Sequence, residues 1–135
     1  MKESIPLSWR RIPERYRMKG VKCIICSTSY FPPRIICPKC RRKGKLEPFY
    51  FKGNGKIYSF TMIHSPASGF EEQVPYVFAI IDLDEGPRVT GQIVDVCKQD
   101  VQIGDSVEAV FRKIQSDDPE GLIHYGFKFR LIDKK

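Results

Sequence analysis

The sequence contains no long hydrophobic run. The longest uninterrupted apolar stretch is Val77–Ile81, whereas a membrane-spanning helix needs about twenty apolar residues. The opening Met-Lys-Glu-Ser-Ile-Pro lacks the apolar core of a secretion signal. We therefore expect a cytoplasmic protein of one or two small domains that has no membrane partner.

Residues for acid–base or nucleophilic catalysis are also scarce. His64 and His124 are the only histidines, and they fall on different predicted strands. No Ser-His-acid order, close carboxylate pair or glycine-rich phosphate loop stands out. Cys97 follows Val96 in an apolar stretch, which predicts a small buried side chain that is neither a metal ligand nor a nucleophile. These scarcities favour a binding protein over an enzyme.

Acidic residues are rare in the first third of the chain. Residues 1–45 hold 13 lysines and arginines against 2 glutamates, whereas residues 46–135 hold 10 basic residues against 14 acidic ones. The net charge of +7 therefore divides into +11 and −4. This asymmetry predicts an anionic partner that docks mainly on the first third of the chain.

Cysteine, by contrast, occurs in a recognisable pattern. Two C-x2-C pairs are separated by ten residues, and their members are Cys23, Cys26, Cys37 and Cys40. This spacing can place four thiolates tetrahedrally around one zinc ion, which then has a structural role because no coordination position stays open. Two disulfides are disfavoured because C-x2-C partners rarely bridge comfortably. Iron is the rival metal, but rubredoxin knuckles usually carry glycine where Ser27 and Arg41 stand here.

The segment before the cysteines has a helical period. Trp9, Ile12 and Tyr16 recur at i, i+3 and i+7, and Ser8 can cap the start of the helix. Pro13 inside this pattern predicts a kinked or broken helix. So short a helix is marginal in water, so its apolar side must pack either on its own chain or on a partner protein. The flanking arginines favour the partner.

After residue 45 apolar residues recur at every second position, which is the period of β-strands. Predicted strands cover residues 49–52, 57–64, 76–83, 88–96, 107–111 and 123–131, with a turn at 53–55 and a bend or bulge at Gly91. Five or six short strands predict an OB-fold barrel, with an SH3-like barrel as the alternative. We therefore predict a mainly β protein. Residues 1–45 form a short helix and a rubredoxin-like zinc ribbon, and residues 46–135 form a five- to six-stranded OB-fold barrel.

Several segments resemble a known family. They are Phe31-Pro32-Pro33-Arg34, Gly55–Thr61, Ile81–Arg88 and Ile103-Gly104-Asp105. With the order of helix, ribbon and barrel, they resemble the two-domain zinc-ribbon/OB-fold family of archaea and bacteria, a domain of unknown function associated with acyl-CoA metabolism. Ser27 departs from the glycine common in that family after the first knuckle. The resemblance implies a non-catalytic accessory subunit that bridges or assists thiolase-type or hydroxymethylglutaryl-CoA synthase-type enzymes.

The residues are compatible with CoA or acyl-CoA as a ligand. CoA offers phosphates to basic side chains and an adenine to aromatic rings. Candidate contacts are Arg34, Lys39 and Arg41 for the phosphates and Phe31 for stacking. Single-stranded nucleic acid is the alternative ligand because it needs the same groups. The charge of −4 on the predicted barrel disfavours it, since a sheet face that follows a polyanion should be basic.

Overall fold

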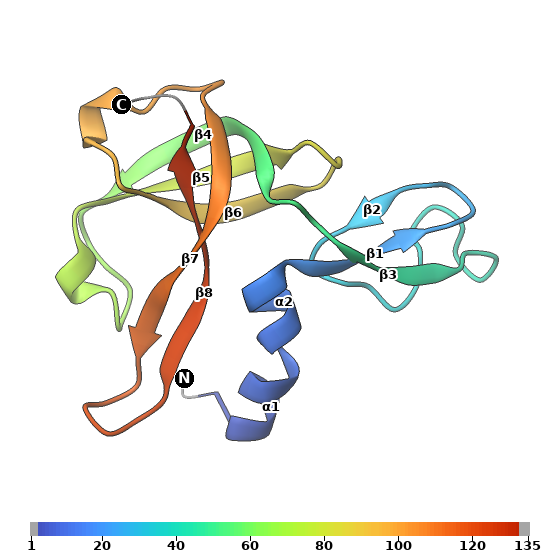
Figure 1. Cartoon of the computed structure of the whole chain (residues 1–135), viewed down its shortest axis with the longest axis horizontal. Coiled ribbons are helices and arrows are strands. Elements are labelled where there is room, and N and C mark those ends of the chain that lie inside the picture. The colour runs from blue at the N-terminus through green and yellow to red at the C-terminus, as the bar shows by residue number, and fades with distance from the viewer. Residues whose placement is uncertain (1–2, 133–135) are drawn as a thin grey trace.

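The computed structural model describes residues 3–132 and shows a mainly β protein in two parts (Figure 1). A barrel forms the larger part, a small three-stranded sheet projects from it, and two short helices lie beside the strand pair β7–β8. Within these residues, no helix is long and apolar enough to cross a membrane.

The N-terminal segment forms two helices, α1 (Ile5–Arg10) and α2 (Ile12–Arg17). Each begins with Ile-Pro. Proline is tolerated in the first turn because the backbone N–H that it lacks would have no hydrogen-bond partner within the helix. The chain breaks between them at Arg11, so the prediction of a broken helix is confirmed. The predicted cap is wrong: Ser4 occupies the N-cap position of α1, and the Ser8 hydroxyl instead donates to the Glu3 carboxylate.

The projecting sheet is built from β1 (Lys19–Cys23), β2 (Ser29–Tyr30) and β3 (Leu46–Tyr50) in the order β2-β1-β3. All its pairs are antiparallel, and β3 runs beside β1 along its full length. We expected the strand near Phe49 to turn at 53–55 into a barrel hairpin, which is wrong. The sheet of the ribbon continues past residue 45, into the segment that we assigned to the barrel.

The barrel closes in the order β4-β5-β6-β8-β7. Its strands are β4 (Asn54–Ile63), β5 (Tyr76–Leu83), β6 (Arg88–Val94), β7 (Ser106–Ser116) and β8 (Ile123–Leu131). Short 3-10 turns, η1 (Glu71–Gln73) and η2 (Lys98–Asp100), lie in two of the connections. Of these five strands, β6 and β8 pair in parallel, and the other neighbours pair antiparallel. Five strands closed in this way form an OB-fold, so the predicted fold is confirmed and the SH3-like alternative is not.

One apolar core fills the barrel and reaches the ribbon. Ile81, Val107 and Phe129 are fully buried inside the barrel, and Met18 and Phe51 from the joining segments belong to the same cluster. The Phe31 ring, from the loop between the cysteine pairs, contacts Phe51 and Phe127 edge to face at 5.8 and 5.6 Å. These contacts fix the ribbon to one end of the barrel.

Gly91 has a different role from the predicted one. The register of the barrel shifts between Ile57 and Ser59 and between Lys113 and Gln115, but β6 pairs regularly through Gly91. A Cβ atom at position 91 would lie 2.6 Å from Cδ2 of the buried Phe129. Glycine is required there because the Phe129 ring crosses directly over the strand.

Gly91→Ala should therefore destabilise the barrel by about 1–3 kcal/mol, the usual cost of an extra methyl group in a packed core. The change is measured by urea unfolding. Thr90→Ala is the matched control, because Thr90 is exposed on the opposite face of the same strand. Equal unfolding midpoints for the two variants would contradict this account of Gly91.

Candidate metal centre and ligand surfaces

The four cysteines of the two C-x2-C pairs come together at the far end of the ribbon. Their sulfur atoms all lie within 4.8 Å of one another. The Sγ atoms of Cys26 and Cys37 are 3.6 Å apart, and those of Cys23 and Cys40 are 4.0 Å apart. Tetrahedral zinc with Zn–S bonds of about 2.3 Å places sulfurs about 3.8 Å apart. The site therefore fits a zinc ion.

The two knuckles hold this geometry through their backbone. Ser27 and Arg41, the residues directly after each pair, have φ values of 58° and 52°. This left-handed conformation explains why glycine is common at these positions in related knuckles. Backbone hydrogen bonds close both turns: the Cys23 N–H donates to the Thr28 carbonyl at 2.9 Å, and the Arg41 N–H donates to the Cys37 carbonyl at 2.8 Å.

Hydrogen bonds prepare one sulfur for ligation. The backbone N–H of Cys40 donates to the Cys37 sulfur at 3.4 Å, and this bond lowers the pKa of the Cys37 thiol to about 6. The Tyr30 hydroxyl lies 3.6 Å from the same sulfur, and this contact raises the pKa of Tyr30 to about 12. Burial raises the pKa of Cys40 to about 12. The lowered pKa favours the thiolate of Cys37, which is the form that binds metals.

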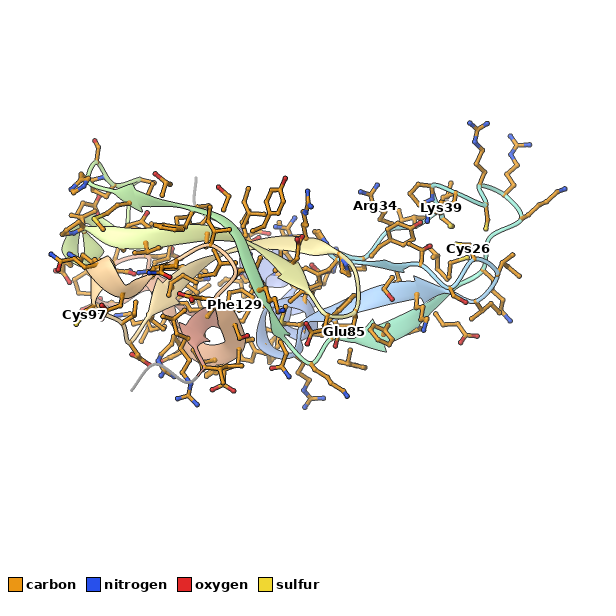
Figure 2. The ribbon with its side chains drawn as sticks, turned by 90° about the horizontal axis from the view of Figure 1, so that it is seen from above. Cys26, Arg34, Lys39, Glu85, Cys97 and Phe129 are labelled. Carbon is orange, nitrogen blue, oxygen red and sulfur yellow. The ribbon has the colours of Figure 1, made fainter. Side chains whose placement is uncertain are left out.

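The fifth cysteine lies elsewhere. Cys97 precedes η2 at the end of the barrel remote from the ribbon, as Figure 2 shows, and is not among the clustered thiols. The expectation that Cys97 is buried is wrong, because its side chain is exposed. The chain has already left the barrel wall at this point, so the apolar residues before Cys97 do not continue into the core.

A pocket of about 390 Å³ separates the ribbon from the turn between β5 and β6. The structure brings two of the predicted ligand residues together there, since both Phe31 and Arg34 line it. Lys39 and Arg41 do not line this pocket; both are exposed farther along the ribbon. Figure 2 shows Arg34 on the ribbon and Glu85 on the barrel turn, two side chains that line the same pocket.

The barrel adds a cation that sequence reasoning missed. Arg88 lines the same pocket, stacks 3.8 Å from the Tyr58 ring and forms an ion pair with Asp82. Its position after the Asp-Glu-Gly-Pro turn is visible in the sequence, but nothing local indicates that this turn faces the ribbon. Phe31 gains a structural role through its contacts with Phe51 and Phe127, and its stacking role stays a prediction.

The three residues predicted for a partner interface line one groove. Trp9, Ile12 and Tyr16 border a cavity of about 310 Å³, whose opposite wall comes from the end of the β7–β8 hairpin. The hairpin residues that line it are Leu122, Ile123, His124 and Tyr125. Sequence reasoning missed this wall because the hairpin lies more than 100 positions away in the chain.

The apolar residues of the helical segment differ in role: some pack on the chain itself, and others stay open to a partner protein. The Tyr16 ring packs edge to face on Phe111 of β7 at 5.0 Å, and Phe111 stacks on Tyr125 at 5.5 Å. Trp9, in contrast, is 72% exposed. The α2 end of the segment is therefore part of the fold, whereas α1 presents an open apolar surface.

Comparison with known proteins identifies the family. Residues 10–47 match the model of the ChsH2 rubredoxin-like zinc ribbon domain, and residues 50–112 match that of the ChsH2 C-terminal OB-fold domain. A DUF35 domain-containing scaffold protein of Methanothermobacter thermautotrophicus is 52% identical over 91% of this chain and 92% of that protein. The chain belongs to the DUF35 scaffold-protein family. The predicted resemblance is thus confirmed.

Two further similar proteins are components of enzymes by name. The benzoylsuccinyl-CoA thiolase subunit BbsA of Geobacter metallireducens is 31% identical over 82% of this chain and 73% of that subunit. A chain of the solved Ltp2–ChsH2(DUF35) aldolase superposes with a TM-score of 0.69 at 26% identity, covering 97% of this chain and 96% of that one. These similarities support an accessory role for a DUF35 protein of this architecture.

The zinc site makes a direct prediction. Elemental analysis should find about one zinc per chain, and Cys37→Ser should lose it because three thiolates leave the tetrahedral site incomplete. Chelation should unfold the ribbon, since metal binding supplies much of the folding free energy of so small a unit. Circular dichroism and limited proteolysis measure that loss.

The matched control is Cys97→Ser, which should keep the zinc content and stability of the parent chain. A ribbon that stays folded in the metal-free protein would contradict the structural role of the zinc. Iron in place of zinc, detected by elemental analysis and by visible absorbance, would show that the predicted metal is wrong.

Proposed function

We propose that this DUF35 protein is a non-catalytic accessory subunit that docks on a thiolase-type or hydroxymethylglutaryl-CoA synthase-type enzyme and contacts the acyl-CoA bound there. The observation that carries the proposal is the similarity to a thiolase subunit along most of both chains. The two open surfaces described above supply the means: a polar pocket at the junction of ribbon and barrel, and an apolar groove beside α1.

The arrangement of titratable side chains supports binding rather than catalysis. His124 lies 3.1 Å from the Asp117 carboxylate at the end of the β7–β8 hairpin, whereas His64 is exposed after β4. The thiols of the ribbon are all placed for metal ligation, which leaves them no open coordination position for a substrate. Such a chain contributes contacts and position to a partner enzyme.

The junction pocket fits the nucleotide end of CoA. Arg34 and Arg88 approach it from the ribbon and from the barrel, and guanidinium groups bind phosphate oxygens with paired hydrogen bonds. Ser27 and Thr28 add hydroxyl groups to the same wall. The ribose 3′-phosphate and the pyrophosphate of CoA are separate anions, so two arginines on opposite walls can each bind one. Lys39 and Arg41, farther along the ribbon, are proposed to attract the anion at longer range.

The groove beside α1 is the proposed contact with the enzyme. Trp9 is the largest exposed apolar side chain bordering it, and tryptophan and tyrosine dominate the energetics of protein interfaces. Ile5 on the same helix is 67% exposed. An apolar groove with aromatic walls buries such groups only when a partner covers it.

CoA binding can be tested with single substitutions. Arg34→Ala and Arg88→Ala should each weaken CoA binding by about 1.5–3 kcal/mol, the range for hydrogen bonds to charged groups. Isothermal titration calorimetry with the full chain, alone and in complex with the enzyme, measures the change. Lys98→Ala in η2, at the opposite end of the barrel, removes the same charge and should leave CoA binding unchanged.

The alternative ligand has its own signature in this experiment. Tight, length-dependent binding of single-stranded oligonucleotides with a steep salt dependence, and no effect of CoA, would assign the surface to nucleic acid. Weak oligonucleotide binding that CoA displaces would support the acyl-CoA function.

The proposed enzyme contact predicts different effects of substitutions at Trp9 and at Tyr16. Trp9→Ala should weaken the complex with a thiolase-type enzyme by about 2 kcal/mol or more while the isolated chain keeps its zinc and its melting temperature. Tyr16→Ala should lower the melting temperature of the isolated chain, because it removes the contact with Phe111. Binding is measured by calorimetry and stability by thermal unfolding. A Trp9→Ala chain that is unstable alone but binds normally would place α1 in the fold instead.

A further inference from the structure

The end of the ribbon exposes four isoleucines. Their exposed fractions are 47% for Ile24, 61% for Ile25, 97% for Ile35 and 60% for Ile36. Isoleucine is among the residue types most often fully buried in folded proteins. Four exposed isoleucines in so small a unit are therefore unusual and mark a candidate contact site. We call these four residues the isoleucine tip.

The metal site brings the isoleucine tip together. Ile24 and Ile25 lie between the first two cysteines, and Ile35 and Ile36 directly precede Cys37. Ile25 and Ile36 each adjoin one of two sulfurs that are only 3.6 Å apart. The backbone N–H of Ile24 also donates to the carbonyl of Lys45 at 3.0 Å. Both isoleucine pairs are therefore held by the same cluster of four cysteines.

The sequence around the tip is basic. From Ile24 to Leu46 it contains six lysines and arginines and no aspartate or glutamate. Lys39, Arg41, Arg42 and Lys43 are all exposed around the second knuckle. Figure 2 shows long nitrogen-tipped side chains projecting from this end of the ribbon. An apolar centre with a charged border is the usual anatomy of a protein interface.

We propose that the isoleucine tip is a second docking surface, which binds a protein through an apolar hollow bordered by aspartate and glutamate. The charge complementarity decides the chemistry of the partner, since the six lysines and arginines between Arg34 and Lys45, with no acidic residue among them, attract carboxylates. The aliphatic side chains indicate that this partner is a protein rather than a nucleic acid. Bases of nucleic acids stack on aromatic rings, and isoleucine offers them no such face. Isoleucine is stiff at χ1, so burying it in a protein hollow costs little side-chain entropy.

The tip is separate from the groove beside α1. The groove is formed by the helices and the end of the β7–β8 hairpin, whereas the ribbon projects away from the barrel on another side (Figure 1). The two surfaces let one chain hold two proteins at once, which is what bridging requires. This inference rests on the proposed function, which names these two proteins as acyl-CoA enzymes.

The test compares two surfaces and two enzymes. The full chain is titrated with a thiolase-type enzyme and with a hydroxymethylglutaryl-CoA synthase-type enzyme from the same organism. The tip variants are the double substitution Ile35→Ser with Ile36→Ser, and Arg42→Glu with Lys43→Glu. Matched controls at the other end of the barrel are Ile103→Ser, whose isoleucine is 69% exposed, and Lys98→Glu. Zinc content and melting temperature confirm that each variant is folded.

Both tip variants should weaken binding of one enzyme about tenfold or more, while the controls bind both enzymes normally. Trp9→Ala should weaken binding of the other enzyme. Tip variants that bind both enzymes as tightly as Ile103→Ser would overturn the proposal and leave the proposed function standing. A wild-type chain that binds neither enzyme would overturn the proposed function and this surface with it. Sedimentation with vesicles of anionic phospholipid, abolished by the isoleucine substitutions, would assign the tip to a membrane surface and also overturn the proposal.

Discussion

The position of the ribbon on the barrel depends on a continuous series of edge-to-face aromatic contacts. The series runs from Phe49 to Phe51, Phe31, Phe127 and finally Phe129, with ring centroids 4.9 to 5.8 Å apart. Each such contact contributes about 0.5–1.5 kcal/mol beyond the burial of the rings. Because the series starts in the sheet of the ribbon and ends in the barrel core, the two parts share one packed centre. The junction pocket and its two arginines exist only because this centre holds them in place.

The ribbon depends in turn on its four thiols. Its buried side chains include Cys23, Cys37 and Ser29, and it has no apolar centre of its own among the residues described. A unit of this size folds only when metal ligation replaces the missing core. The same shortage leaves apolar residues such as Ile35 outside. Since the ribbon cannot bury its isoleucines, its end is free to present them to another protein.

The surfaces of the molecule therefore follow from how each part is stabilised. The barrel has an apolar core of its own, and its β7–β8 hairpin extends beyond the barrel wall to receive α2. Tyr16 of α2 is held there by Phe111, whereas Trp9 lies in the preceding helix α1 and stays exposed.

Local patterns in the sequence were sufficient for several features. The spacing of Cys23, Cys26, Cys37 and Cys40 predicted the cluster of thiols, because a C-x2-C turn brings its own two sulfurs together. The two-residue period predicted the bounds of β5 and β8, and Pro13 predicted the break between the helices. Each of these features depends on residues that are close in the chain.

Only the tertiary structure decided which segments meet. Alternation shows which face of a strand is apolar but does not name its neighbour, so the pairing of β3 with β1 could not be read from its residues. Gly91 is explained by the ring of Phe129, which lies 38 positions later in the chain. Arg88 joins Arg34 because a barrel turn faces the ribbon, and Trp9 borders a groove because a distant hairpin supplies its second wall. The sequence by itself determined the metal site and the two folds, whereas packing between distant segments decided where ligands and partners can bind.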